Sequence, residues 1–177
     1  ILSACSSTPQ PTPDFEQSYL ERAQTQEKDG IRVTAAVPSA KESKRIFGQS
    51  LYRRGVQPVW LKIENKRDEI VSFLPVGLDP AYYSSNEVAN LGVKEKGASK
   101  RGSVIDLVYF DKGIVSNIDA GGQNSGFIFS KLDEGTKSFN VDVIGDFGLV
   151  TFTFFIPVPG LKLDHHNVNW EAIYPGD

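Results

Sequence analysis

Two neighbouring segments in the last third of the chain alternate apolar and polar residues with a period of two. Their apolar members are Phe139, Val141 and Val143, then Val150, Phe152, Phe154 and Ile156. Because successive side chains of a β-strand point to opposite faces, this alternation predicts strands over 137–144 and 149–156, each with one buried face. The polar and glycine-containing stretches 133–136 and 145–148 predict the turns that precede these two strands.

Earlier parts of the chain show the same signal. Four further strands are predicted, over 31–37, 56–65, 70–74 and 126–132. The first ends before Pro38, and the second has Val59, Leu61 and Ile63 on one face. The polar segment 65–68 predicts a turn that joins the second and third strands as a hairpin. Several short strands separated by turns are typical of an all-β antiparallel β-sandwich, and the helix–strand alternation of a parallel α/β fold is absent.

Helices are predicted only at the periphery. Residues 14–29 have a helical stripe and Asp14 as N-cap, with Gly30 just past the end, so we expect a short N-terminal helix there. Residues 85–91 predict a short helix capped by Ser85. The stretch 41–45 is a solvated basic and polar segment or one helical turn. Residues 104–110 are compatible with helix or strand, and we expect a loop over 121–124.

The start of the chain predicts a lipid anchor. Leu2-Ser3-Ala4-Cys5 resembles the lipobox of bacterial lipoproteins, which implies cleavage before Cys5 and acylation of that residue. The following polar, proline-rich residues favour an extended tether of about 25 Å. Ser6 after the cysteine favours, by this resemblance, the outer membrane with a periplasmic domain. We therefore expect a signal-peptide remnant over 1–4, anchor and tether over 5–13, the helix over 14–30 and the sandwich over 31–177.

Some strand sequences carry a second resemblance. Residues 124–129 and 139–143, Asn-Ser-Gly-Phe-Ile-Phe and Phe-Asn-Val-Asp-Val, are similar to the late hairpin of immunoglobulin-like domains in small bacterial lipoproteins. Residues 57–65 and 154–160 resemble segments of uncharacterised exported lipoproteins. The resemblance implies an immunoglobulin-like sandwich and an address in the cell envelope. It brings no catalytic motif.

No residue pattern predicts catalysis, a cofactor or a metal. His165 and His166 are the two histidines, and adjacent residues on an extended chain point to opposite sides, so we expect a polar loop. The acidic residues lack the spacing of a calcium loop, and 146–148 is a turn. Four basic residues over 94–101 indicate a solvated loop, with contact to anionic lipid as the alternative. A net charge of −3 gives no case for nucleic acid.

Aromatic and proline residues are the candidate interface, because Trp and Tyr often anchor protein contacts. The candidates are Trp60, Tyr82, Tyr83, Phe155, Pro157 and Pro159. Trp60 lies opposite the apolar face of its strand, so it belongs either to an interface or to a core or the area under a covering helix. We expect a non-enzymatic lipid-anchored adaptor that contacts other envelope proteins, such as those of a secretion-system core. The alternative is a periplasmic small-molecule or glycan binder that stacks its ligand on the first three aromatics.

Overall fold

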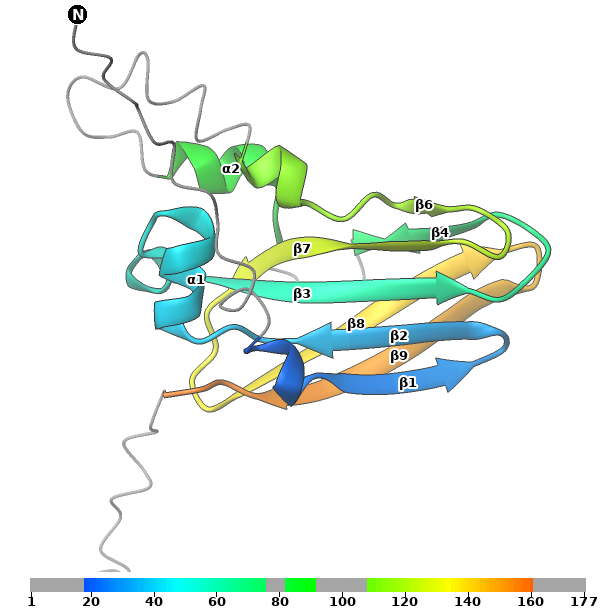
Figure 1. Ribbon diagram of the computed structural model, residues 1–177, viewed down its shortest axis with the longest axis horizontal. Helices are drawn as coiled ribbons and strands as arrows, with labels where there is room; N and C mark the ends of the chain where they lie inside the picture. Colours follow the sequence, from blue (N-terminus) through cyan, green and yellow to red (C-terminus); the bar gives the residue numbers. More distant parts are fainter. Residues whose placement is uncertain (1–17, 76–81, 92–107, 161–177) are drawn as a thin grey trace, which may run out of the picture.

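The computed structural model describes residues 18–75, 82–91 and 108–160, and these residues form mainly two antiparallel sheets packed face to face (Figure 1). The β3 sheet has the order β1 (Gln24–Lys28), β2 (Ile31–Ala36), β3 (Val56–Asn65), β7 (Gln123–Lys131) and β5 (Tyr82–Tyr83). The β8 sheet has the order β6 (Asn117–Ile118), β4 (Val71–Leu74), β8 (Thr136–Gly145) and β9 (Gly148–Pro157). The predicted all-β antiparallel sandwich is confirmed.

The core between the sheets is formed by the residues that alternate in the sequence. Val59, Leu61 and Ile63 of β3 are fully buried, and the predicted inward residues of β8 and β9 are also buried. Phe139 and Phe154 stack across the β8–β9 pair, with ring centroids 5.4 Å apart and planes 18° apart. Burial of this apolar face is the main force that holds the two sheets together.

A second apolar cluster covers the outer face of the β3 sheet. It receives side chains from α1 (Ala40–Phe47), η3 (Leu51–Arg54), α2 (Ser85–Asn90) and a helical segment over 108–112. Phe47 stacks on Tyr109 and meets Phe127 and Phe129 of β7 edge to face. Because β7 is covered on both faces, residues 126–130 are all buried and do not alternate.

The helix α1 was predicted as a solvated stretch or a single turn, and it is eight residues long. It begins with a capping box in which the Ser39 hydroxyl accepts from the Glu42 N–H and the Glu42 carboxylate accepts from the Ser39 N–H. It ends at Gly48, which has a φ of 70° and therefore tolerates the left-handed C-cap. The cap at 84–87 of α2 has the same form, with Ser84 as N-cap and not Ser85 as predicted.

The prediction of a helix over 14–29 is wrong in its described part. A short 3-10 helix, η2 (Leu20–Arg22), is followed by the strand β1, which pairs with β2. Asp29 and Gly30 have φ values of 51° and 77°, and this pair of left-handed residues makes the tight turn between the two strands. Gly30 therefore serves a hairpin and does not end a helix. Residues 14–17 lie outside the described part.

The predicted hairpin of β3 and β4 is also wrong. After β3 the chain crosses to the other sheet, where β4 pairs with β8 and β6. The Asn65 side-chain amide holds this crossing, because it donates to the main-chain carbonyls of Glu69, Ile118 and Asp119. A further difference concerns residues 123–124, which were predicted as loop and begin β7.

Candidate functional site

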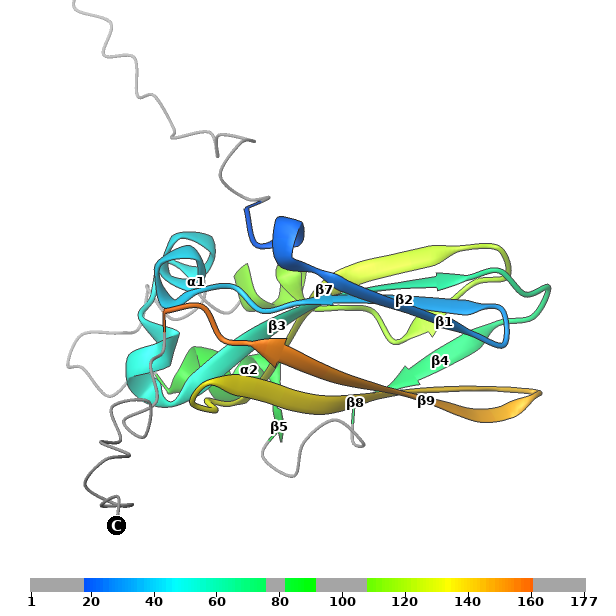
Figure 2. The same cartoon turned by 90° about the horizontal axis from the view of Figure 1, so that it is seen from below.

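The outer face of the β8 sheet carries the most distinctive surface of the described residues. The described helices pack on the other sheet, and Figure 2 shows β8 and β9 on the side of the sandwich away from η2. Ten residues of β8 and β9 point outward between the buried ones. We call them the bare face: Thr136, Ser138, Asn140, Asp142, Ile144, Leu149, Thr151, Thr153, Phe155 and Pro157.

The bare face is poor in charge. Among its ten residues, all of them described, Asp142 is the single ionisable side chain. The exposed half of the β3 sheet differs, because Glu27 pairs there with Arg32 at 2.8 Å and Lys62 pairs with Glu64 at 3.2 Å. Both surfaces belong to antiparallel strands of the same molecule. Solvent exposure of a strand therefore does not by itself account for the low charge of the bare face.

Exposed apolar side chains lie at both ends of the bare face. Phe155 is 61% exposed beside Ser138, and Leu149 is 58% exposed beside Ile144. An exposed phenylalanine on a strand exposes a large apolar area to water, which is the type of feature that marks a contact site when it belongs to a patch.

Cross-strand hydrogen bonds fix the middle of the bare face. The Thr151 hydroxyl donates to the Asp142 carboxylate at 2.6 Å, and the Thr153 hydroxyl donates to the Asn140 side-chain oxygen at 2.9 Å. These pairs lie directly opposite each other in the β8–β9 register. Side chains that are already ordered lose less conformational entropy when a partner binds, so the face is preorganised for contact.

The free edge of β9 is closed by two glutamines of β1. The Gln24 amide donates to the Phe155 carbonyl at 2.8 Å, and the Gln26 amide donates to the Thr153 carbonyl at 2.7 Å. Pro157, farther along this edge, has no N–H to offer a further strand. The Thr153 and Phe155 carbonyls are therefore already hydrogen-bonded and do not pair with a strand of another protein. A partner would contact the side chains of the bare face instead.

The predicted interface residues are divided by the structure. Phe155 and Pro157 lie on the bare face, and Pro159 is half-buried in the turn after β9. Trp60 is half-buried on the other sheet, where its ring meets Tyr19 edge to face at 6.2 Å. The chain's own segment before β1 therefore covers it.

The tyrosine pair does not join Trp60 in one surface. Tyr82 packs against the core between the sheets, whereas Tyr83 packs against the outer aromatic cluster. This opposite placement is what two successive residues of a strand must have. The three aromatics therefore do not form the single stacking platform expected for a glycan or small-molecule binder.

Two buried polar groups were not singled out by the sequence. The Lys137 ammonium is fully buried at one end of the sandwich, where it donates to the Asp133 carboxylate at 2.8 Å and to the Lys131 carbonyl at 3.0 Å. Tyr109 is buried under α1, and burial raises the pKa of its hydroxyl to about 12. Lys137 has the same strand parity as inward Phe139, so a charged residue at an inward position was the available signal for it, whereas the residues around Tyr109 contain no comparable signal.

The remaining predicted site residues do not meet in the described structure. Within 18–75, 82–91 and 108–160 no group of three His, Cys, Asp or Glu residues is placed to hold a metal ion. The predicted turn is present between β8 and β9, where it consists of Asp146 and Phe147, and Gly148 begins β9. Cys5, the 94–101 segment, His165 and His166 lie outside the described residues. None of the described helices has the length and apolar character needed to cross a membrane.

No protein-family model matches the sequence, and a search among curated proteins finds no significant match.

Proposed function

We propose that this protein is a non-enzymatic adaptor, anchored to the outer membrane through acylated Cys5, that contacts other envelope proteins through the bare face. A secretion-system core is one assembly of this kind. The observation that carries the proposal is the combination of exposed Phe155 with a single ionisable residue among ten outward positions.

Low charge supports a protein contact for a physical reason. Removing an ionised side chain from water costs free energy unless it is paired, and the centres of protein interfaces are accordingly poor in charge and rich in aromatic residues. A face that only meets solvent has no such constraint, as the ion pairs of Glu27 and Lys62 on the other sheet illustrate. The bare face has the composition of the first type of surface.

The size of the bare face favours a weak contact. Two ten-residue strands at about 3.4 Å per residue and 4.8 Å spacing cover on the order of 300 Å². Stable complexes bury roughly 800 Å² on each partner. A weak contact becomes effective when both partners are held on one membrane, because tethering raises their effective concentration. The proposed anchor and the small interface are therefore mutually consistent.

The test introduces charge into the bare face and into a matched position on the other sheet. Thr153→Glu adds a carboxylate at the centre of the bare face. Thr25→Glu is the control, because Thr25 is also an exposed strand threonine whose hydroxyl is hydrogen-bonded across the strand pair, to Thr34 at 2.9 Å. Both variants are purified in detergent from the native membrane at equal abundance, and stoichiometric partners are quantified.

We expect Thr153→Glu to lower partner recovery at least tenfold, since an unpaired buried carboxylate costs more than 1.4 kcal/mol. Thr25→Glu should recover partners as the wild type does. Equal losses from the two variants, or a wild-type protein that purifies as a monomer binding a small ligand, would contradict the adaptor function.

A further inference from the structure

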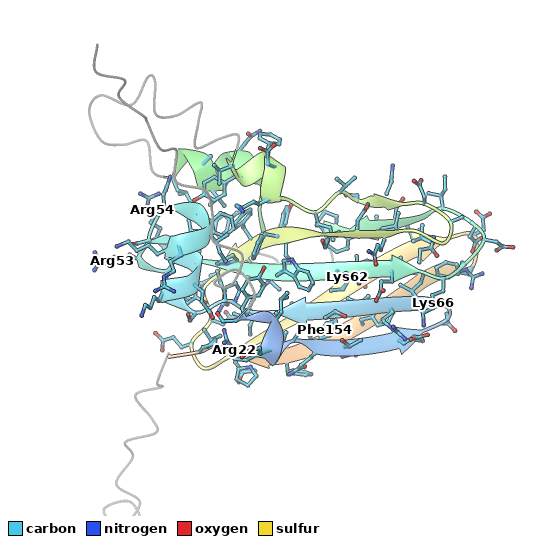
Figure 3. The ribbon with its side chains drawn as sticks, in the orientation of Figure 1. Arg22, Arg53, Arg54, Lys62, Lys66 and Phe154 are labelled. Carbon is cyan, nitrogen blue, oxygen red and sulfur yellow. The ribbon has the colours of Figure 1, made fainter. Side chains whose placement is uncertain are left out.

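One end of the molecule is strongly basic. The helix α1 and the following η3 expose Lys41, Lys44, Arg45, Arg53 and Arg54. We call these five residues the basic end. Figure 3 shows Arg53 and Arg54 at the α1 end of the sandwich, pointing away from the sheets, whereas Lys66 lies at the other end.

Most carboxylates close to the basic end are already bound. Glu42 pairs with Arg22 at 2.6 Å, and Asp133 pairs with buried Lys137. Glu87 accepts hydrogen bonds from the backbone and hydroxyl of Ser84 at the start of α2. Exposed Glu134 in the β7–β8 turn and exposed Asp111, next to the segment that stacks on Phe47, are opposing charges. The five basic side chains outnumber these two carboxylates, so the described charges at this end sum to a positive value.

The opposite end carries the other sign. Four turns meet around Arg67, which donates to the Asp29 carbonyl, pairs with Glu69 and lies over the Phe147 ring, while its own carbonyl accepts from Gly121. These turns expose four carboxylates, of Asp29, Asp68, Asp119 and Asp146. They outnumber the exposed Lys28 and Lys66 at the same end, and Lys66 is paired with Glu27 at 2.5 Å. Positive charge is therefore concentrated at one end of the long strands and negative charge at the other end.

The chain enters the domain beside the basic end. The Ser18 hydroxyl donates to the Glu42 carboxylate of α1, and Tyr19 is buried against Trp60 and Phe127. This entry point is therefore fixed relative to α1. Cys5 is 13 residues earlier in the sequence, a separation that full extension limits to about 45 Å.

We propose that the basic end docks on the anionic phosphate headgroups of the membrane that holds the protein. The orientation rests on the proposed anchor at Cys5, whereas the attraction depends only on charge. Each Lys or Arg near an anionic bilayer strengthens binding roughly fivefold. Docking in this way points the acidic turns away from the surface. The strands β8 and β9 then run away from the membrane, so the bare face stays open to a neighbouring protein on the same membrane.

The experiment uses the full chain with Cys5→Ser, so that no acyl chain contributes. Co-sedimentation is measured with phosphatidylcholine vesicles and with vesicles containing about one third phosphatidylglycerol. The test variant changes Lys44, Arg53 and Arg54 to Gln. The control variant changes Lys28, Lys62 and Lys66 to Gln, which removes the same charge from the remainder of the surface.

We expect binding to the anionic vesicles alone, and loss of that binding near 0.5 M salt, because screening shortens the field to a few ångströms. The test variant should bind on the order of 100-fold more weakly, and the control should change about twofold. An Arg53→Lys, Arg54→Lys variant should bind nearly as the wild type does, because a bilayer attracts charge regardless of the shape of the cation.

Three results would overturn the inference. One is absence of binding to anionic vesicles at low salt, and another is an equal loss in the test and control variants. The third is displacement by inorganic phosphate at matched ionic strength, or tighter binding to a duplex oligonucleotide, either of which assigns the basic end to another ligand. Thr153→Glu should leave vesicle binding unchanged, so failure of the bare face as an interface and failure of the basic end as a membrane contact are separable.

Discussion

Phe154 and Phe155 are adjacent in sequence and have opposite environments, so replacing each by alanine tests the structure at a single point. Phe154 is fully buried in the core and stacks on Phe139, whereas Phe155 is 61% exposed on the bare face. The two substitutions remove the same atoms. Any difference in their effects therefore comes from the side of the sheet on which the side chain lies.

The expected magnitudes follow from burial. Phe→Ala in a packed core costs about 3–5 kcal/mol, because apolar contacts are lost and a cavity remains. The stacked partner Phe139 adds to this loss, since aromatic pairs contribute roughly 0.5–1.5 kcal/mol beyond their buried area. Phe155→Ala exposes little new apolar surface, and we expect a cost below about 0.5 kcal/mol. Its effect should instead be a loss of partner recovery.

Urea denaturation followed by tryptophan fluorescence measures both changes. With a slope of about 2 kcal/mol per M for a domain of this size, Phe154→Ala should lower the midpoint by roughly 2 M and Phe155→Ala by less than about 0.3 M. The unfolding slopes should be equal in the two variants, because the exposed area changes little. Equal and small shifts of the two midpoints would refute the assignment of the inward face of β9.

Three further outcomes are expected. Cys5→Ala should prevent acylation and release or mislocalise the protein, and mass spectrometry of the mature N-terminus should find acyl chains on Cys5 of the wild type; an unmodified cysteine in membrane-derived protein would contradict the anchor. Double replacement of Gln24 and Gln26 by alanine frees two edge carbonyls of β9. Light scattering should therefore detect self-association of the double variant, and less self-association of either single variant. Burial opposes ionisation of Glu42, yet hydrogen bonds from Ser18, Ser39 and Arg22 lower its pKa from 4.5 to about 2. Its folded-state pKa is depressed, so its contribution, on the order of 2 kcal/mol, should be complete above about pH 5 and lost between pH 4.5 and 2. Glu42→Gln should remove this part of the pH dependence in thermal unfolding, and an unchanged acid profile would refute it.

Strands could be predicted from the sequence where one face is buried and the other is exposed to solvent. In β3, β8 and β9 the alternation of apolar residues placed each inward side chain correctly, because a period of two has no other simple explanation. In β7 the same reasoning gave the strand but not its two-sided burial. Phe127 and Phe129 pack outward under the helices, and only the presence of that outer layer decides this.

The prediction of a helix over 14–29 was wrong because the strand that forms there has no buried apolar face to show in its sequence. Gln-Thr-Gln-Glu-Lys of β1 has no apolar residue, so local patterning contains no sign of a strand. Its conformation comes from main-chain pairing with β2 and from glutamine contacts to β9, which are both non-local. The crossing after Asn65 has a similar cause, because the Asn65 side-chain amide donates to the carbonyls of Ile118 and Asp119, more than 50 residues away. Such long-range contacts override a local turn signal.

The bare face was nevertheless present in the same alternation that predicted the core. Once strands are assigned over 137–144 and 149–156, the residues between the apolar ones are the outward residues, and almost all of them are uncharged. Aromatic content alone points elsewhere, to Trp60, Tyr82 and Tyr83, which the fold distributes over a covered face and two sides of one strand. Charge counted by face is the more informative signal. An aromatic ring is equally at home in a core and an interface, whereas a strand face that omits charge while exposed has no reason to do so in water alone.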